Sequence, residues 1–186
     1  MLDAFERERP ETRAVRLRPG LIFKRETGKE MRRLFTGPFL PPRLVRPDFV
    51  PVVPDIPGLR FQAVHSRDVG DAYRLAIIGD ARGAFNIAAE PVLDPPELAR
   101  LLDARTIKMP ARAARGFATA TWRLHLQPTP PGWLDLALGA PLLDTTRARE
   151  ELGWEPRVSS GDALLELMQG IHDRASAPTP PLEVVA

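Results

Sequence analysis

The stretch AVRLRPGLIF, residues 14–23, decides how the fold of this chain is understood. Apolar and charged residues alternate over 14–18, which predicts a β-strand. Pro19 and Gly20 follow this strand, and the sequence then continues as the apolar run 21–23. Because Gly20 carries no side chain, a flat group can approach the backbone there. We therefore expect the end of this strand to border a pocket that other segments complete.

The composition describes an ordinary globular protein with an unusual amount of proline. The chain has 186 residues, of which 44% are hydrophobic and 27% charged, enough for one domain with a real core. It holds 21 prolines, well above the usual share of about 5%, which predicts many loops and short elements. The net charge is +2 and the basic residues are scattered, so we expect no nucleic-acid partner.

Several kinds of site and location are excluded by what the sequence lacks. There is no cysteine, which excludes disulfides, thiolate metal sites and a cysteine nucleophile. No apolar run approaches the roughly 20 residues of a membrane span, and the N-terminus has no apolar signal core. We therefore expect a cytoplasmic protein without a membrane partner.

Hydrophobic periodicity predicts an α/β chain that is richer in helices in its second half. Strands are expected at 14–18, 60–65, 84–88 and 106–108, with a short one near 50–53 inside a proline-rich loop, 37–59. Helices are expected at 2–9, 68–78, 111–126, 133–138, 145–152 and 162–173, with shorter ones ending at Phe35 and beginning at Asp94. Residues 175–186 are expected to form a flexible tail.

Cap residues and an apolar stripe refine several of these helices. Thr27 and Glu30 have the spacing of a capping box, and Asp68 stands where an N-cap is expected for helix 68–78. Asp144 is the expected cap of helix 145–152, and Ser159 or Ser160 that of the last helix. The stripe that we expect to face the core of helix 68–78 consists of Val69, Ala72, Tyr73, Ala76 and Ile77.

The sequence contains no self-sufficient catalytic constellation. It has no glycine-rich dinucleotide turn, no phosphate-binding P-loop and no nucleophile elbow. The sole tyrosine, Tyr73, is followed four residues later by Ile77, so there is no Tyr-x-x-x-Lys pair. The three histidines have no partner at metal-ligand spacing. We predict no catalytic residue and no metal site.

Four segments, taken in order, resemble one enzyme family. They are RLRPGLIF (16–23), FQAVHSRDVGDAYRLAI (61–77), GAFNIAAEPVLDPPELARLL (83–102) and LLDTTRAREELGWEP (142–156). Together they resemble the C-terminal half of extended short-chain dehydrogenases/reductases, the NAD-dependent epimerase/dehydratase family, over about residues 2–172. The resemblance implies a Rossmann-type fold and oxidoreductase or isomerase chemistry with NAD or NADP.

The resemblance also implies positions for a binding site. Pro19, Gly20, Leu21 and Ile22 match the place where the family lines its cofactor, and Leu21, Phe23, Gln62 and His65 match substrate-side positions. The family often has Tyr-Gly-Pro where this chain has Phe23-Lys24-Arg25, so a small-molecule substrate other than a sugar nucleotide stays open.

Structural roles compete with functional ones for several of these residues. His65 and Asn86 are expected to hydrogen-bond within the protein, with pocket lining as the alternative for His65. Trp154 is expected in the core, and Asp71 and Glu97 on solvated helix faces.

In the family, the glycine-rich turn and the catalytic Tyr-x-x-x-Lys precede the region matched here. We therefore expect residues 1–174 to be the last Rossmann strands plus a substrate-binding part, truncated and inactive alone, with exposed strand edges that favour self-association. One alternative is a non-catalytic partner module, which either completes a separately encoded N-terminal half or docks on a homologue or a second copy. Another alternative is a reading frame that is mis-called or degraded.

Overall fold

The computed structural model describes residues 2–35 and 49–177, and the chain divides into two compact units. Unit 1 comprises residues 1–23, 60–94 and 140–163, and unit 2 comprises residues 24–59, 95–139 and 164–186. Most of the expected proline-rich loop, and the expected tail from residue 178 on, lie outside the described residues.

Unit 1 is built on two pairs of parallel strands. β1 (Val15–Pro19) pairs with β5 (Gly83–Ile87), and β2 (Leu21–Phe23) pairs with β4 (Ala63–His65). The register places Leu17 beside Phe85 and Phe23 beside His65. The expected strands at 14–18, 60–65 and 84–88 are thus confirmed, with small shifts at their ends.

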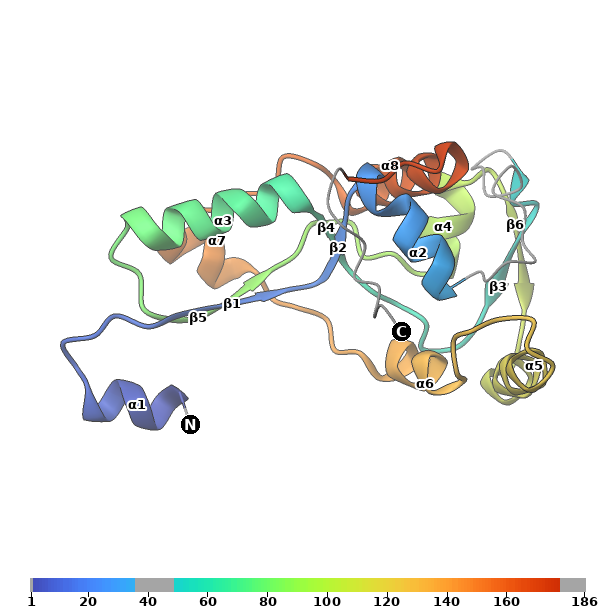
Figure 1. The fold of residues 1–186 in the computed structure, drawn as a ribbon, viewed down its shortest axis with the longest axis horizontal. Coiled ribbons are helices and arrows are strands. Elements are labelled where there is room, and N and C mark those ends of the chain that lie inside the picture. Colours follow the sequence, from blue (N-terminus) through green and yellow to red (C-terminus); the bar gives the residue numbers. More distant parts are fainter. Residues whose placement is uncertain (1, 36–48, 178–186) are drawn as a thin grey trace, which may run out of the picture. The chain divides into compact units, whose positions relative to one another are not determined.

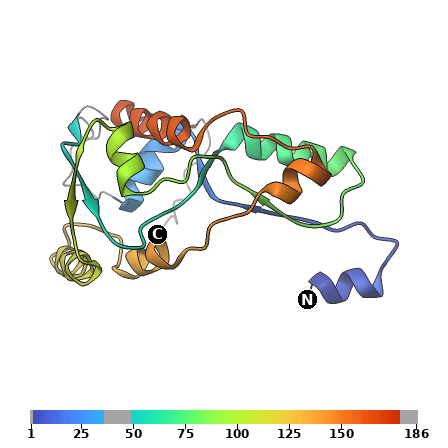
Figure 2. The same ribbon diagram turned by 180° about the vertical axis from the view of Figure 1, so that it is seen from behind.

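Helices of unit 1 cover these strands and enclose its core. α3 (Ser66–Ile78) and α7 (Thr146–Leu152) lie side by side (Figures 1 and 2). α1 (Leu2–Glu8) precedes β1, and α8 (Ser160–Asp173) begins in this unit. The core residues are Val64, Val69, Ala72, Ala76, Phe85, Ile87, Ala148, Leu152 and Trp154. Trp154 is fully buried, as expected.

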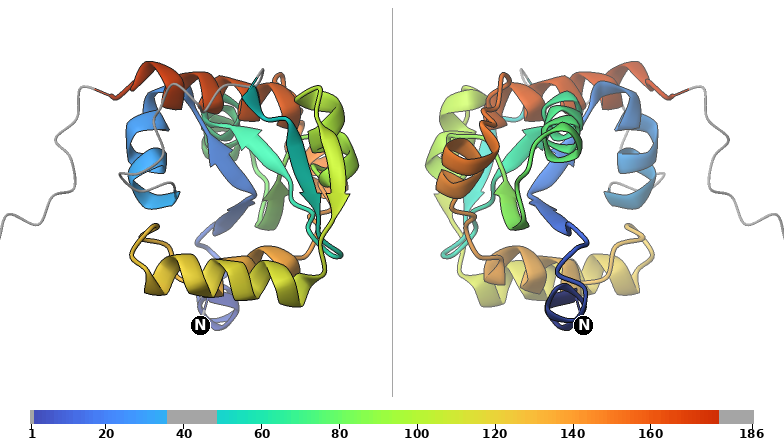
Figure 3. Two further views of the ribbon diagram at one scale, coloured as in Figure 1. Left: turned by 90° about the vertical axis from the view of Figure 1, so that its right-hand side faces the viewer. Right: turned by 90° about the vertical axis from the view of Figure 1, so that its left-hand side faces the viewer.

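Unit 2 contains the third parallel pair of strands and most of the helices. β3 (Val52–Asp55) pairs with β6 (Arg105–Lys108), and α4 (Pro95–Leu101) packs beside both (Figure 3). The unit also holds a 3-10 turn, η1 (Arg25–Thr27), followed by α2 (Gly28–Phe35). α5 (Ala111–Arg123) and α6 (Gly132–Gly139) lie in contact with each other. These elements confirm the expected helices and the strand near 106–108, except that α5 ends at Arg123 and does not reach residue 126.

Two of the expected caps are wrong. His65 is the N-cap of α3, because its Nδ1 accepts the Arg67 N–H at 3.1 Å; Asp68 therefore lies inside the first turn. Thr27 closes η1 by donating its hydroxyl to the Lys24 oxygen at 2.7 Å, so the capping box with Glu30 does not form. In each case the side chain bonds another backbone group instead: Thr27 bonds the local Lys24 oxygen, and Asp68 accepts the N–H of the distant Val158 at 3.0 Å.

The remaining helix ends lie close to the expected ones. The expected cap Asp144 lies one residue before the N-cap of α7, which is Thr145, and its Oδ1 accepts the Thr146 N–H at 2.9 Å; Gly153 ends this helix in the left-handed region, with φ 64°. Of the two candidate serines at the start of α8, Ser159 is the cap: its hydroxyl accepts the Asp162 N–H at 3.0 Å.

The apolar stripe of α3 is half buried and half exposed. Val69, Ala72 and Ala76 are buried, as expected, whereas Tyr73 is 53% exposed and Ile77 is 71% exposed. The expectation that Tyr73 packs in the core is therefore wrong. The reason is geometric: the covering strands and α7 meet one narrow stripe of α3, and Tyr73 and Ile77 lie beside it.

No helix in the described part of the chain is long and apolar enough to cross a bilayer.

Candidate functional site

The extended strand 15–23 changes its partner at Gly20. Up to Pro19 it pairs with β5, and the Gly20 N–H still donates to the Ile87 oxygen at 2.9 Å. The next N–H, that of Leu21, donates to the Gln62 oxygen at 3.0 Å and begins the pairing with β4. Gly20 is therefore the point where the two strand pairs of unit 1 meet.

The chain beyond β5 joins the same junction. The Ala89 N–H donates to the Ala63 oxygen at 2.9 Å, and Phe61 and Leu93 form an antiparallel bridge. Residues 61–63 thus bond both to the strand that carries Gly20 and to the chain after β5. The carboxyl ends of β1 and β5 part at this point, which is where ligands bind in open α/β sheets.

The structure explains the glycine at position 20 by packing within the chain, and not by the approach of a flat ligand that the sequence predicts. A Cβ at this position would lie 2.7 Å from the Gln62 carbonyl oxygen and 3.6 Å from the Ala88 Cβ. The space beside the α-carbon is therefore filled by this chain's own backbone. The glycine is required for the strands to approach one another.

Leu21 and Ile22 remain accessible directly after the junction. Leu21 is 50% exposed and Ile22 is 45% exposed, whereas Phe23 is buried. Because successive side chains of a strand point to opposite faces, Leu21 and Ile22 each offer an apolar surface, on opposite faces of β2, on which a flat ring can pack. Pro19 is half-buried at the end of β1.

Gln62 is fully engaged within the protein. Its Oε1 accepts the Leu143 N–H at 2.7 Å, and its Nε2 donates to the Leu143 oxygen at 3.3 Å and to Glu90 Oε1 at 3.0 Å. The side chain thus imitates a strand partner for residue 143. Gln62 holds segment 140–144 against β4 and has no hydrogen-bonding group left to reach a ligand in this arrangement.

His65 is buried at the end of β4. It is 1% exposed and caps α3 through Nδ1. This geometry supports the structural role expected for His65. Asn86 is likewise structural: its Nδ2 donates to the Asp144 oxygen at 2.9 Å and ties β5 to the start of α7.

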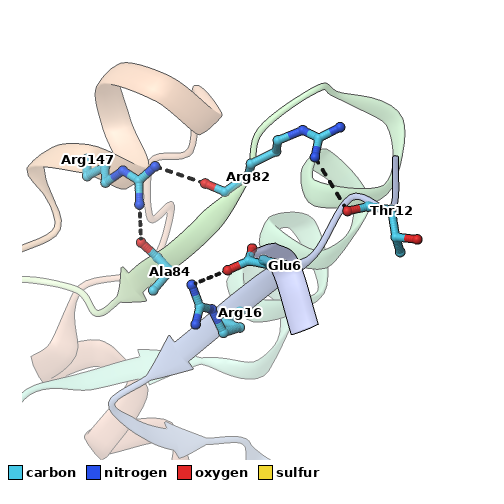
Figure 4. A network of polar contacts seen from close by, with 6 residues as sticks. All are labelled: Glu6, Thr12, Arg16, Arg82, Ala84 and Arg147. Atoms are coloured by element: carbon cyan, nitrogen blue, oxygen red, sulfur yellow. Dashed lines mark hydrogen bonds and ion pairs between the residues drawn. The ribbon is translucent and has the colours of Figure 1, made fainter. Parts of the chain in front are cut away.

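A polar network secures the opposite, amino-terminal end of the β1–β5 pair (Figure 4). Arg147 on α7 donates to the backbone oxygens of Arg82 and Ala84, each at 2.9 Å, and its guanidinium lies 4.5 Å from the Phe85 ring centroid. Arg16 on β1 pairs with Glu6 on α1 at 2.9 Å. These contacts fix the strand pair whose other end carries the junction.

Sequence reasoning missed one residue at the junction. Ser160 is fully buried, and its hydroxyl lies 2.7 Å from the Ala89 oxygen and 2.9 Å from the Ala63 oxygen, while accepting the Ala63 N–H at 3.2 Å. The sequence pattern indicates this serine only as a candidate helix cap. One signal in the sequence could have indicated it: Ser159 and Ser160 are adjacent, only one of them can cap α8, and the other is then available for a tertiary contact.

Within residues 2–35 and 49–177, no group of three or more histidine and acidic side chains could hold a metal ion. Asp71 and Glu97 lie on helix faces, paired with Arg74 at 2.9 Å and Arg100 at 2.5 Å.

No protein-family model matches this sequence, and no curated protein is detectably similar to it. Solved structures do match the fold. The UDP-glucose 4-epimerase of Thermotoga maritima, solved with UDP-glucose, is 21% identical with a TM-score of 0.54, and the match covers 93% of this chain and 50% of that one.

Two further epimerases give the same result. The UDP-glucose 4-epimerase of Thermus thermophilus, in complex with NAD, is 14% identical with a TM-score of 0.52 over 95% of this chain and 51% of that one. The UDP-N-acetylglucosamine 4-epimerase of Bacillus cereus is 10% identical with a TM-score of 0.51 over 91% and 51%. The chain spans about half the length of these structures. The likeness confirms the predicted α/β, Rossmann-type fold class.

Proposed function

We propose that this chain supplies the substrate side of an NAD(P)-dependent site of the extended short-chain dehydrogenase/reductase family, with an epimerase, dehydratase or reductase reaction. The observation that carries the proposal is the junction at Gly20, where Leu21 and Ile22 stay exposed at the carboxyl ends of parallel strands. The substrate is a sugar nucleotide or another small molecule with a carbonyl or hydroxyl group. The matched epimerase structures, solved with UDP-glucose or NAD, support this class.

NAD(P), when bound, would supply hydride transfer. The residues of this chain fit one end of such a cofactor: Leu21 and Ile22, which point to opposite faces of β2, each offer an apolar wall for the nicotinamide, and Pro19 and Gly20 set the course of the backbone before them. The sequence has no glycine-rich turn for the pyrophosphate. The site therefore needs a dinucleotide-binding part in addition to these 186 residues.

The four positions expected to contact substrate divide into two groups. Leu21 is exposed, and we assign the substrate contact to it. Phe23, Gln62 and His65 are buried and would act by holding that wall in place. In this proposal the general acid and base also come from outside these residues, from the Tyr-x-x-x-Lys pair that the family implies.

The experiment compares the 186-residue chain alone with the same chain supplied with a dinucleotide-binding part. Such a part is sought as in-frame codons before Met1 or as a neighbouring gene, in either case encoding a glycine-rich turn and Tyr-x-x-x-Lys. We expect no NAD(P)-dependent turnover from the chain alone and turnover from the completed protein. Turnover of UDP-glucose or a related substrate by the chain alone would refute the proposal.

A second candidate is a non-catalytic partner module that binds a separately encoded N-terminal half. The observation that favours it is the absence from the sequence of the Tyr-x-x-x-Lys pair needed for proton transfer. The two candidates differ in one outcome: the partner module binds the other half with no gain in turnover.

A further inference from the structure

One segment of unit 2 combines a strong positive charge with exposed apolar side chains. Residues 104–134 contain four arginines, one lysine and no aspartate or glutamate, in a chain that has 26 basic and 24 acidic residues in total. The segment spans β6, α5 and the turn before α6. Its exposed large apolar residues are Ile107, Phe117, Trp122, Leu124, Leu126 and Trp133.

Helix α5 arranges the two kinds of residue on one exposed surface. Positions 113, 116, 117 and 120 follow the i, i+3, i+4, i+7 spacing of one helix face, and all four are exposed. Phe117 is the large residue of this face and is 70% exposed. Arg112 and Arg123 lie about three turns apart along the edge of the same face. Ala114, which lies on the neighbouring side of the helix, is buried.

The surface continues past the end of α5. Leu124 and Leu126 are 68% and 45% exposed, and Trp122, Arg123 and His125 line one shallow depression there. Arg115 donates from Nε to both carboxylate oxygens of Asp135 on α6, at 2.9 and 3.1 Å. This ion pair joins α5 to α6, so that both helices fix the position of the surface.

We infer that the surface of α5 and residues 124–126 docks on an anionic lipid bilayer. A basic amphipathic helix with exposed Phe, Trp and Leu lies in a membrane interface with its apolar face down, while the arginines reach the headgroups. Trp122 lies on another side of α5 from Phe117 and belongs to the depression at the end of the helix; tryptophan is typical of the membrane interface. The contact is peripheral and differs from membrane spanning, which the described helices do not support.

Charge and chemistry favour this occupant over the alternatives. A second copy of the chain would bring an acid-free, arginine-rich face against itself, which is unfavourable. Single-stranded nucleic acid prefers aromatic stacking platforms, whereas much of this surface is aliphatic. The inference does not depend on the proposed enzymatic function, because it uses none of the residues around Gly20.

The test is co-sedimentation of the full 186-residue chain with vesicles. We expect binding to vesicles of equal parts phosphatidylcholine and phosphatidylglycerol, little binding to phosphatidylcholine alone, and release at about 0.5 M NaCl. The double variant Arg112→Gln/Arg123→Gln should lower the partition coefficient by about 25-fold, since each basic residue near an anionic surface contributes about fivefold. Phe117→Ser should lower it severalfold.

Two matched controls separate this surface from general charge and hydrophobicity. Arg67→Gln/Arg149→Gln removes the same charge from exposed positions on α3 and α7, and Ile77→Ser removes an equally exposed apolar side chain. Both should leave vesicle binding unchanged. Circular dichroism of each variant reports whether it folds, and the tryptophan fluorescence of the chain should shift to the blue on binding.

Several results would overturn the inference. One such result is that the chain binds vesicles without phosphatidylglycerol as well as vesicles that contain it. Another is that the test variants and the control variants lose vesicle binding equally. A dimer in sedimentation velocity that Phe117→Ser dissociates would assign the surface to a second copy. Tighter binding to an oligonucleotide than to the anionic vesicles would likewise assign it to nucleic acid.

Discussion

Trp154 donates its indole N–H to the backbone oxygen of Asp68 at 2.8 Å, and the Asp68 carboxylate in turn accepts the Val158 N–H at 3.0 Å. Both Trp154 and Asp68 are buried. This reciprocal contact ties the Leu-Gly-Trp-x-Pro segment, which lies more than 80 positions away in the sequence, to the first turn of α3. It explains why Asp68 is not the cap of α3: its carboxylate serves a tertiary contact instead.

Replacing Trp154 by Phe should destabilise unit 1 strongly. The change leaves a buried carbonyl without its donor and a cavity beside α3, at a cost of about 2–4 kcal/mol in the free energy of unfolding. Urea unfolding measures it. Trp133→Phe, at a position that is 50% exposed, is the control and should cost less than about 1 kcal/mol. Equal losses in the two variants would contradict the role assigned to Trp154.

Gly20→Ala should be destabilising although it adds a single methyl group. The new Cβ would meet the Gln62 carbonyl at 2.7 Å and force the strands at the junction apart, at a cost of about 1–3 kcal/mol. On α5, a Cβ at Gly116 would meet no heavy atom within 4 Å, so Gly116→Ala should stabilise by up to about 1 kcal/mol. Thermal unfolding of the two variants should therefore shift in opposite directions.

Gln62→Leu should release segment 140–144 from β4. It leaves the Leu143 N–H and oxygen without their side-chain partner, which costs about 1–3 kcal/mol. Hydrogen exchange of the Leu143 amide should become faster while that of β5 changes little. Gln169→Leu, an exposed glutamine on α8, serves as the control; unchanged protection of Leu143 in Gln62→Leu would show that the pairing is unimportant.

The hydrogen bonds of Asp144 at the start of α7 should make the stability of the protein depend on pH in the acid range. Hydrogen bonds from Thr146, from its side chain first and then its backbone, lower the pKa of Asp144 below its ordinary 3.8. A lowered folded pKa contributes stability that is present above the unfolded value and is lost as the pH falls through the folded value. Asp144→Asn keeps an oxygen acceptor, so its stability should change less between pH 5 and about pH 3. Identical pH profiles would contradict this role.

The order of the elements could be predicted from the sequence because each carries its own signal. The alternation at 14–18, the Asp94-Pro95-Pro96-Glu97 helix start and the glycine at 153 all specify local backbone geometry, and the structure has these elements. The partners of side chains could not be predicted in the same way. Asp68 and Thr27 each had a good local cap geometry, but contacts with Val158 and Lys24 were formed instead.

In the candidate site, too, local features could be predicted from the sequence and contacts between distant segments could not. The exposure of Leu21 and Ile22 fits the position expected for them beside a ligand. The complete engagement of Gln62 by residues 90 and 143 depends on a contact between distant segments, which no local pattern encodes. Composition averaged over the whole chain also concealed the acid-free segment 104–134, because acidic residues elsewhere balance its charge.

The most direct test of the proposed function measures NAD(P)-dependent turnover of the completed protein carrying Leu21→Asp, with Ile77→Asp, at an exposed apolar position on α3, as the control. A carboxylate buried in the apolar wall of a closed site costs about 3 kcal/mol or more, so Leu21→Asp should lower turnover by at least about 100-fold while Ile77→Asp keeps it. Full turnover in Leu21→Asp would contradict the account, because the wall beside Gly20 would then not face the reacting groups.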